Sequence, residues 1–352
     1  MTHAFLETLN RLRAPVQSRM QQYLHGGSVA GISDARSTQV EAFHWDLVRN
    51  YPDRGGKYLR PALLLLTLEA MTGAYDSGVQ TAAALEISQN WLLVHDDVED
   101  QSLLRRGEDA LQIMHGDAHA INAGDALHLL MWHMLRDNEP ILGASKTLAV
   151  MDEFHRMLYR TCVGQTAELM WQKRLDFTED DYFYIIDGKT GYYTIAGGMR
   201  LGAIIASTDP AQLDHAILPV INRFGVNLGR AFQIIDDVLD VASDGDGKQR
   251  GGDIAEGKIT LLLAHLLAHA SEADRDRIDA VMCLPREAID QAMVDEVIGL
   301  MEAYGSIAYA RQRAAELAGH ARDIFGEMDF LVEDGPRAEL AAMIDFITAR
   351  GS

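Results

Sequence analysis

The chain has few cysteines and no long apolar run, and each scarcity excludes a class of protein. Two cysteines, Cys162 and Cys283, in 352 residues cannot build a disulfide framework. No apolar run approaches the roughly 18–20 residues that a membrane-spanning helix needs, and the N-terminal segment has the pattern of an amphipathic helix rather than of a signal peptide. These absences favour a reducing compartment, and we expect a cytoplasmic protein without a stable membrane anchor.

Basic residues are scarce relative to acidic ones. The sequence contains 31 Lys and Arg against 52 Asp and Glu, which gives a formal net charge of -21 at pH 7. Such a charge repels polyanions, so we expect neither nucleic acid nor an anionic membrane surface as a partner. An anionic substrate would have to be attracted locally, by metal ions and a few cations.

The rest of the composition predicts helices. Only eight prolines occur, and the long tracts between them are rich in good helix formers such as Ala, Leu, Met and Glu. Apolar positions recur at helical spacing from Phe224 to Leu239, and alternating strand-type runs are scarce. A Gly- and Asp-rich stretch at residues 243–257 is the longest predicted loop. Because no low-complexity linker separates two halves, we expect one large all-α domain over residues 1–352, a helical bundle.

Two aspartate-rich clusters lie within segments that otherwise have the pattern of apolar helices. Each follows the pattern DDxxD, as DDVED at residues 96–100 and as DDVLD at residues 236–240. Residues four positions apart share a helix face, so each cluster projects its first and last carboxylates to one side. Unpaired buried charge is costly, whereas Mg2+ prefers oxygen ligands of this kind. The clusters predict a magnesium-dependent diphosphate site with the candidates Asp96, Asp97, Asp100, Asp236, Asp237 and Asp240.

A polar stripe extends each cluster along its helix. Gln89 precedes the first cluster and Gln233 the second, both at helical spacing. Such a stripe on an apolar helix indicates that other helices surround it and that the stripe faces a cavity. The other interpretation is a solvent-exposed helix face, which the near-absence of interleaved Lys or Arg disfavours.

Short groups of cations beside glycines lie near both clusters. A segment such as Gly55-Gly56-Lys57, placed before a helix, can offer backbone amides and side chains to an anion. Each group alone is more often a surface charge, but their joint placement around two aspartate clusters is typical of phosphate ligands. The candidates are Lys57, Arg60, Arg105, Arg106, Lys189, Lys248 and Lys258.

The motifs follow one another in an order that resembles a known family. They are GGKYLRP (55–61), HDDVED (95–100), RRG (105–107), AGDAL (123–127), KTGYYT (189–194), FQIIDDVLD (232–240) and GGDIAEGKIT (251–260). Over nearly its whole length the chain resembles the trans-isoprenyl diphosphate synthases of the polyprenyl synthetase family. The resemblance implies an all-α bundle, with both aspartate helices facing one deep central cavity, and a homodimer.

The resemblance also implies a reaction of the geranylgeranyl or farnesyl diphosphate synthase type. Isopentenyl diphosphate would be condensed with an allylic diphosphate, which loses pyrophosphate with the help of about three Mg2+ ions. The metal ligands implied are Asp96, Asp100, Asp236 and Asp240, with Asp97 and Asp237 as further catalytic residues. The allylic diphosphate would be bound by Arg105, Lys189, Lys248 and Lys258, and isopentenyl diphosphate by Lys57, Arg60, Arg106 and Gln89. Gln89 stands where many members have histidine, and the oxygens of Thr190 and Gln233 would line the cationic centre.

Product length is predicted from the residues before the first cluster. Trp91 and Leu92 lie about one helical turn before Asp96, where bulky side chains would form a floor for the growing tail. In the family, a single aromatic residue five positions before the first aspartate suggests a C20 product, and two adjacent aromatics suggest C15. We therefore expect geranylgeranyl diphosphate, with farnesyl diphosphate as second choice. The alternative is that another helix sets the length and Trp91 is only part of the core.

Two further classes of function are weighed against the elongating enzyme. A class I terpene cyclase shares one DDxxD motif and a helical bundle, but its second metal motif usually has an Asn/Ser/Glu arrangement, unlike residues 236–240. A non-catalytic prenyltransferase subunit should have lost aspartates, and none is lost here.

Overall fold

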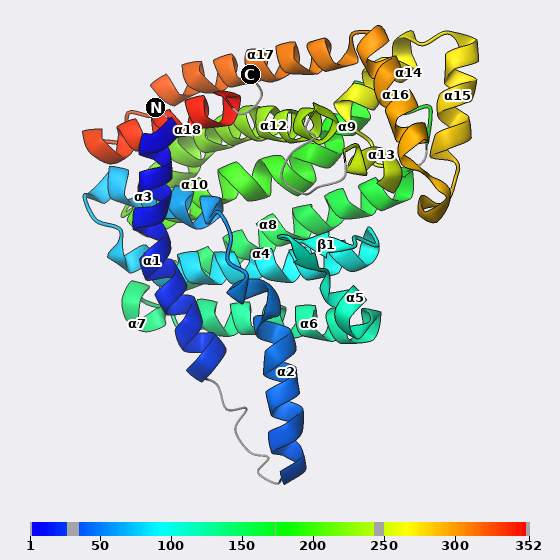
Figure 1. Cartoon of the computed structure of the whole chain (residues 1–352). Helices are drawn as coiled ribbons and strands as arrows, with labels where there is room; N and C mark the ends of the chain where they lie inside the picture. The colour runs from blue at the N-terminus through cyan, green and yellow to red at the C-terminus, as the bar shows by residue number, and fades with distance from the viewer. Residues whose placement is uncertain (1, 27–34, 173, 243–249, 350–352) are drawn as a thin grey trace.

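The computed structural model describes residues 2–26, 35–172, 174–242 and 250–349, and these segments form an all-α protein, as the sequence predicts (Figure 1). Strand structure within them is limited to a hairpin, in which β1 (Leu104–Arg105) pairs antiparallel with β2 (Glu108–Asp109). No helix in these segments is long and apolar enough to cross a membrane. The expectation of a single domain stays a prediction.

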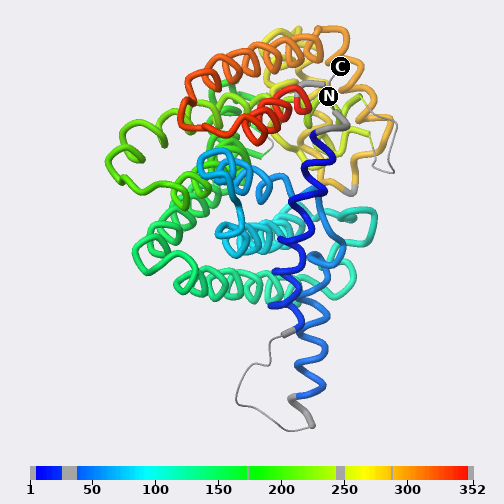
Figure 2. Tube along the Cα trace, turned by 90° about the vertical axis from the view of Figure 1, so that its left-hand side faces the viewer, coloured from blue at the N-terminus to red at the C-terminus, as the bar shows by residue number. Residues whose placement is uncertain are grey.

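The first half of the chain places the first aspartate cluster at the end of a buried helix, α4. Helices α1, α3 and α6 all pack against α4, and the layered arrangement is visible in Figure 1. In Figure 2, α2 and the end of α1 extend together away from the other helices. The elements of this half are α1 (Thr2–Gly26), α2 (Ala35–Asp53), α3 (Leu59–Thr72), the 3-10 turn η1 (Asp76–Gly78), α4 (Val79–Glu99), α5 (Leu111–His115), α6 (Asp117–Arg136), α7 (Glu139–Leu142) and α8 (Ala144–Trp171).

Helix α3 is apolar on every side because it is surrounded by protein. The leucines at 63–66 are all fully buried. Helix α10 approaches α3 through Gly202, where an added Cβ would lie only 2.4 Å from the Leu64 carbonyl oxygen. This close contact fixes α3 in the core, and with it Arg60 in its first turn.

The middle of the chain is a continuous helical stretch followed by the helix of the second cluster. Lys189, Thr190 and Gly191 lie inside the π-helix η2, which joins α9 to α10 without a break. Such wide turns are frequent at functional sites. The elements are α9 (Glu179–Ile186), η2 (Asp187–Ala196), α10 (Gly197–Ala206), α11 (Pro210–Gln212), the π-helix η3 (Leu213–Ile217) and α12 (Leu218–Ala242).

Helix α12 connects the two hydrophobic cores of the molecule. Its first half, including Phe224 and Leu228, packs into the core formed with α1, α3 and α4. Its second half, including Ile234 and Val238, packs into the core formed with α9, α14 and α16. The second aspartate cluster therefore lies on the half of α12 that packs into the second core.

The last part of the chain covers one side of α12, with α17 packed along it. Of the loop predicted at residues 243–257, residues 243–249 lie outside the described residues, and the described part includes the short helix α13. Residue Lys248 lies outside the described residues, so its predicted role stays a prediction. The elements are α13 (Gly252–Glu256), α14 (Leu261–His269), α15 (Glu272–Met282), the 3-10 turn η4 (Arg286–Ala288), α16 (Gln291–Ala303), α17 (Ser306–Gly326) and α18 (Asp334–Ala349).

Candidate active site

A cavity of about 480 Å³ brings residues from both aspartate clusters together. Its walls come from α4, α8, α9, η2, α12 and the segment around α13. A volume of this size suits a small organic ligand. The predicted site residues that line it are Arg60, Gln89, Trp91, Leu92, Asp96, Lys189, Thr190, Gln233, Asp236, Asp237 and Lys258.

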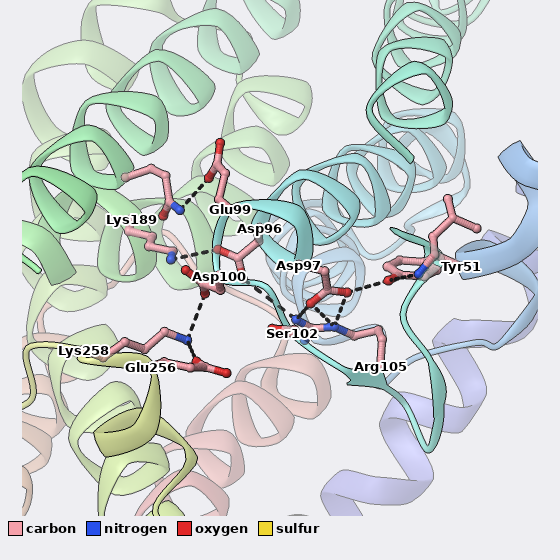
Figure 3. Close-up of polar contacts among 12 residues, drawn as sticks. Tyr51, Asp96, Asp97, Glu99, Asp100, Ser102, Arg105, Lys189, Glu256 and Lys258 are labelled. Atoms are coloured by element: carbon pink, nitrogen blue, oxygen red, sulfur yellow. Dashed lines mark hydrogen bonds and ion pairs between the residues drawn. The ribbon is translucent and has the colours of Figure 1, made fainter. Parts of the chain in front are cut away.

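The terminal aspartates of the first cluster each bind a lysine (Figure 3). Lys189 donates from Nζ to Asp96 Oδ1 at 2.9 Å. The Nζ atom of Lys258 lies 3.0 Å from Asp100 Oδ2. Both lysines come from segments remote in sequence, η2 and the turn after α13, so the cluster is where these segments meet α4.

Burial and nearby charges shift the pKa values of Asp96 and Asp100 in opposite directions. Burial alone would raise the pKa of Asp96, but the charges of Lys189 and Lys258 outweigh it and the pKa lies below its ordinary value. At Asp100 burial prevails over Lys258 and raises the pKa to about 6. The pKa of Lys189 is raised, because Asp96 and Glu168 outweigh a burial that would lower it.

The middle aspartate of each cluster is buried and bonded to a tyrosine. Asp97 accepts from Tyr51 Oη at 2.5 Å and from the guanidinium of Arg105, whose Nε lies 2.9 Å from Oδ2. Figure 3 shows Asp97 turned toward Tyr51 and Arg105, whereas Asp96 and Asp100 point toward the lysines. Asp237 accepts from Tyr182 Oη at 2.8 Å. The second position of each motif thus anchors its helix to neighbouring elements.

A chain of hydrogen bonds orients the polar groups of η2 and α12. Thr190 Oγ1 donates to Gln233 Oε1 at 3.0 Å, and Gln233 Nε2 donates to Asp237 Oδ1 at 2.8 Å. Burial raises the pKa of Asp237 to about 7, against the hydrogen bonds from Gln233 and Tyr182. These hydrogen bonds can form because Gly229 lets η2 and α12 come into close contact. An added Cβ at Gly229 would lie 2.4 Å from Gly191 Cα.

The rest of the second cluster lies beside α13. Asp236 is exposed and lines the cavity. Asp240 accepts from the backbone N–H of Asp253 at 3.1 Å and so helps to begin α13. Asp253 also lines the cavity, and burial raises the pKa of its carboxyl group well above the ordinary value.

A second group of cations surrounds the start of α3. Arg60 donates from Nη2 to Thr194 Oγ1 at 2.7 Å, and its guanidinium lies over the Tyr193 ring, 4.7 Å from the ring centre. Arg60 Nε and Gln89 Oε1 are buried without a hydrogen-bond partner, although both residues line the cavity. Buried polar atoms of this kind are rare, and here they are available to a ligand. Lys57 is exposed nearby in sequence and does not line the cavity.

The RRG motif forms the turn of the β1–β2 hairpin and separates its two arginines. Arg106 and Gly107 have φ of 55° and 82°, as a two-residue hairpin turn requires. Arg105 then reaches back to Asp97, while Arg106 donates from Nη1 to the Tyr51 carbonyl oxygen at 2.8 Å. Neither arginine lines the cavity. Arg105 therefore holds Asp97 from outside the cavity.

The oxygen ligands fit magnesium that is shared with a phosphate group. Among the described residues, no three His, Cys, Asp or Glu side chains converge to hold a metal by themselves. Mg2+ in phosphate-transfer sites is commonly held by one or two carboxylates and completed by water and substrate oxygens. Asp100 Oδ1, buried without a hydrogen-bond donor, and the cavity carboxylates meet that requirement.

Several residues of the site carry no sequence signal of their own. Tyr51 and Tyr182 lie far in sequence from the aspartates that they bind, and Glu168 stands in α8 apart from any acidic cluster. Asp253 and Glu256 stand inside the GGDIAEGKIT motif, where the lysine and the glycines drew attention instead.

Comparisons with known proteins give the family. The chain matches the model of the polyprenyl synthetase family over residues 44–301. It is 35% identical over 298 residues to a short chain isoprenyl diphosphate synthase of Methanothermobacter thermautotrophicus, covering 84% of this chain and 87% of that protein. It is 33% identical over 273 residues to an octaprenyl diphosphate synthase of Escherichia coli, covering 76% and 78%.

A solved structure agrees with the sequence comparisons. A geranylgeranyl pyrophosphate synthase from Corynebacterium glutamicum, complexed with isoprenyl diphosphate and magnesium, superimposes with a TM-score of 0.84 at 28% identity, covering 97% of this chain and 99% of that one. The fold and the cavity thus define a trans-prenyltransferase. The chain belongs to the polyprenyl synthetase family. A polyprenyl synthase from Caulobacter crescentus, which is 26% identical with a TM-score of 0.76 and covers 99% of this chain and 96% of that one, was solved as a complex with calcium and isoprenyl diphosphate.

Proposed function

We propose that this enzyme condenses isopentenyl diphosphate head-to-tail with dimethylallyl, geranyl or farnesyl diphosphate and releases pyrophosphate. The observation that carries the proposal is the convergence of both aspartate clusters, Lys189 and Lys258 on one cavity. A cyclase or a non-catalytic subunit would not need the additional cationic group around Arg60.

The allylic diphosphate would bind between the two clusters. About three magnesium ions, held by Asp96, Asp100, Asp236 and Asp240, would supply positive charge that stabilises the departing pyrophosphate. Lys189 and Lys258 would orient the diphosphate, with Lys248 and Arg105 as the remaining predicted contacts. Asp97 and Asp237 would position the clusters, because their oxygens accept hydrogen bonds from tyrosines.

Isopentenyl diphosphate would bind beside it, at the start of α3. Arg60 and Gln89 have buried polar atoms without hydrogen-bond partners, and Lys57 and Arg106 would complete the set. The double bond of isopentenyl diphosphate would then attack the allylic carbon, and a proton would leave to the released pyrophosphate. The oxygens of Thr190 and Gln233 would face the cationic centre, while apolar walls exclude water.

We propose geranylgeranyl diphosphate as the main product. The indole of Trp91 is 8% exposed, lines the cavity with Leu92 and stacks on His128 with ring centres 4.2 Å apart. Its Nε1 also donates to His95 Nδ1 at 3.2 Å. An indole held on two sides makes a rigid floor. Relatives are named as geranylgeranyl, geranylfarnesyl and octaprenyl diphosphate synthases, so product length is tested separately from the reaction.

We further propose a homodimer. Large apolar side chains are exposed along two helices that pack side by side, α6 and α8. An exposed apolar surface of this kind marks an interaction site. Its members are Ile121, Leu129, Leu148, Tyr159, Val163 and Met170. A cytoplasmic location and the absence of a nucleic-acid partner stay predictions from composition.

The test is elongation with defined primers. The purified protein is incubated with Mg2+, isopentenyl diphosphate and each allylic primer in turn, and the products are sized by mass spectrometry. We expect elongation that stops at C20. A product longer than C30 would support the elongation reaction but contradict the proposal that Trp91 limits product length. Cyclised hydrocarbon without isopentenyl incorporation would instead indicate a cyclase, and no reaction with any primer would indicate a non-catalytic subunit.

A further inference from the structure

Both cavity lysines lie among carboxylates, and the two arrangements share a pattern. Lys189 Nζ donates to Asp96 Oδ1 at 2.9 Å and to Glu168 Oε2 at 2.6 Å. Lys258 Nζ lies 3.0 Å from Asp100 Oδ2 and 2.7 Å from Glu256 Oε2, with Asp253 Oδ1 farther away at 3.9 Å. At each lysine, one of the two nearest carboxylates belongs to the first aspartate cluster and the other is a glutamate outside both clusters.

The two glutamates have fixed positions of their own. Glu168 is 8% exposed within α8. Glu256 accepts from Arg286 Nη1 at 2.8 Å, and the same nitrogen donates to the Asp100 carbonyl oxygen at 2.9 Å. Arg286 thereby ties the end of α4 to α13. Glu256 lies beside Lys258, on the side away from Asp100 (Figure 3).

The group holds more carboxylates than cations. Its carboxylates, Asp96, Asp100, Asp253, Glu168 and Glu256, face Lys189, Lys258 and Arg286. A divalent cation entering alone would meet the lysine ammonium groups beside the carboxylates that it must bind, and like charges at such separations repel. A diphosphate changes the balance, because it gives both the lysines and the metal additional oxygens to bind.

We propose that Lys189 and Lys258 form ion pairs with the terminal aspartates of the first cluster until a diphosphate binds. The aspartates then bind the metal, and Glu168 and Glu256 keep the lysines at the cavity wall through the ion pairs that remain. The proposal rests on the proposed function, because the diphosphate is that of its substrate. It makes metal and diphosphate binding mutually dependent, and the coupling must be reciprocal. The glutamates are positioning residues, since they act through the lysines.

The test measures metal binding directly, with Mn2+ as the probe and free Mn2+ followed by electron paramagnetic resonance. Lys258→Met removes the competing cation from Asp100. Since a neighbouring opposite charge shifts a carboxylate equilibrium by roughly tenfold or more, we expect Mn2+ without pyrophosphate to bind about tenfold more tightly to the variant. With inorganic pyrophosphate present, the variant should bind both ligands more weakly than the wild type. Lys189→Met should behave in the same way.

Two further variants separate this effect from general disturbance. Glu256→Gln removes the nearest carboxylate of Lys258 and leaves the lysine more firmly on Asp100, so Mn2+ without pyrophosphate should bind more weakly than to the wild type. Lys146→Met is the matched control, because Lys146 donates to the backbone oxygen of Ile205 outside the cavity. It should bind Mn2+ as the wild type does.

The proposal is overturned if folded Lys258→Met and Lys189→Met bind Mn2+ without pyrophosphate no more tightly than the wild type. It is also overturned if Glu256→Gln shifts Mn2+ affinity in the same direction as Lys258→Met. Failure of the proposed function looks different, because the wild-type protein would then not elongate any primer whatever the Mn2+ titrations show.

Discussion

Replacing Asp97 by asparagine tests whether this aspartate anchors α4 or binds the metal. The carboxylate is 0% exposed and accepts hydrogen bonds from Tyr51 and from the guanidinium of Arg105. Asparagine keeps the shape and removes the charge, so the guanidinium faces a neutral amide. Breaking a buried ion pair by removing one partner destabilises a protein by about 3–5 kcal/mol. Because the Arg105 side chain is 26% exposed, we expect the lower limit, about 3 kcal/mol.

Two measurements on the same variant test this reasoning. Urea unfolding of the metal-free protein should show the loss of stability, and a Mg2+ titration of elongation should show an unchanged magnesium requirement. Asp96→Asn is the matched control, because Lys189 keeps Glu168 as a partner there. It should lose less stability and need more magnesium. If Asp97→Asn kept wild-type stability and needed more magnesium than Asp96→Asn, the middle aspartate would be a metal ligand and the reasoning would be wrong.

Three other substitutions give independent predictions. Trp91→Ala removes the ring that stacks on His128 and should give products longer than those of the wild type; an unchanged product distribution by mass spectrometry contradicts the floor. Gly229→Ala places a Cβ 2.4 Å from Gly191 Cα, so it should lower the free energy of unfolding in urea by about 1–3 kcal/mol. Gly319→Ala on α17 is the control and should not lower it, because an added Cβ there meets nothing within 4 Å. Burial raises the pKa of Glu86, so the folded protein holds this proton more tightly and stability should fall as the pH rises from about 4.3, the ordinary glutamate value, through the raised pKa. Glu86→Gln should remove that fall, and a urea midpoint that declines equally in both proteins would count against it.

The parts of the molecule that the sequence predicts well are those with a repeated or local signal. Helices follow from composition and spacing, and the DDxxD pattern places two carboxylates on one face of α4 and of α12. The structure puts Asp96 and Asp236 on one cavity. The RRG turn also follows from local chemistry, because glycine accepts the positive φ that Gly107 adopts.

The parts that could not be predicted depend on contacts between remote segments. Nothing in the local sequence shows that Tyr51 will bind Asp97 or that Glu168 will bind Lys189. The different tasks within each DDxxD motif follow from those contacts rather than from the motif. The π-helix at Lys189 could not be predicted either, since it depends on the packing of Gly191 against Gly229 in the remote helix α12.

The loop predicted at residues 243–257 was wrong in part for a related reason. Glycine-rich sequence indicates a loop, but Asp240 accepts a hydrogen bond from the backbone of Asp253. That bond supports the first turn of α13 from a helix thirteen residues earlier, which composition alone does not show.

The central claim is that both aspartate clusters serve one metal-dependent reaction, and a single comparison tests it most directly. Asp96→Asn and Asp236→Asn, both folded by circular dichroism, are incubated with Mg2+, farnesyl diphosphate and labelled isopentenyl diphosphate beside the wild type. We predict that the wild type makes geranylgeranyl diphosphate and that either substitution alone nearly abolishes incorporation of the label. Full incorporation by one of the two variants would show that its cluster takes no part in the reaction, and would contradict the account.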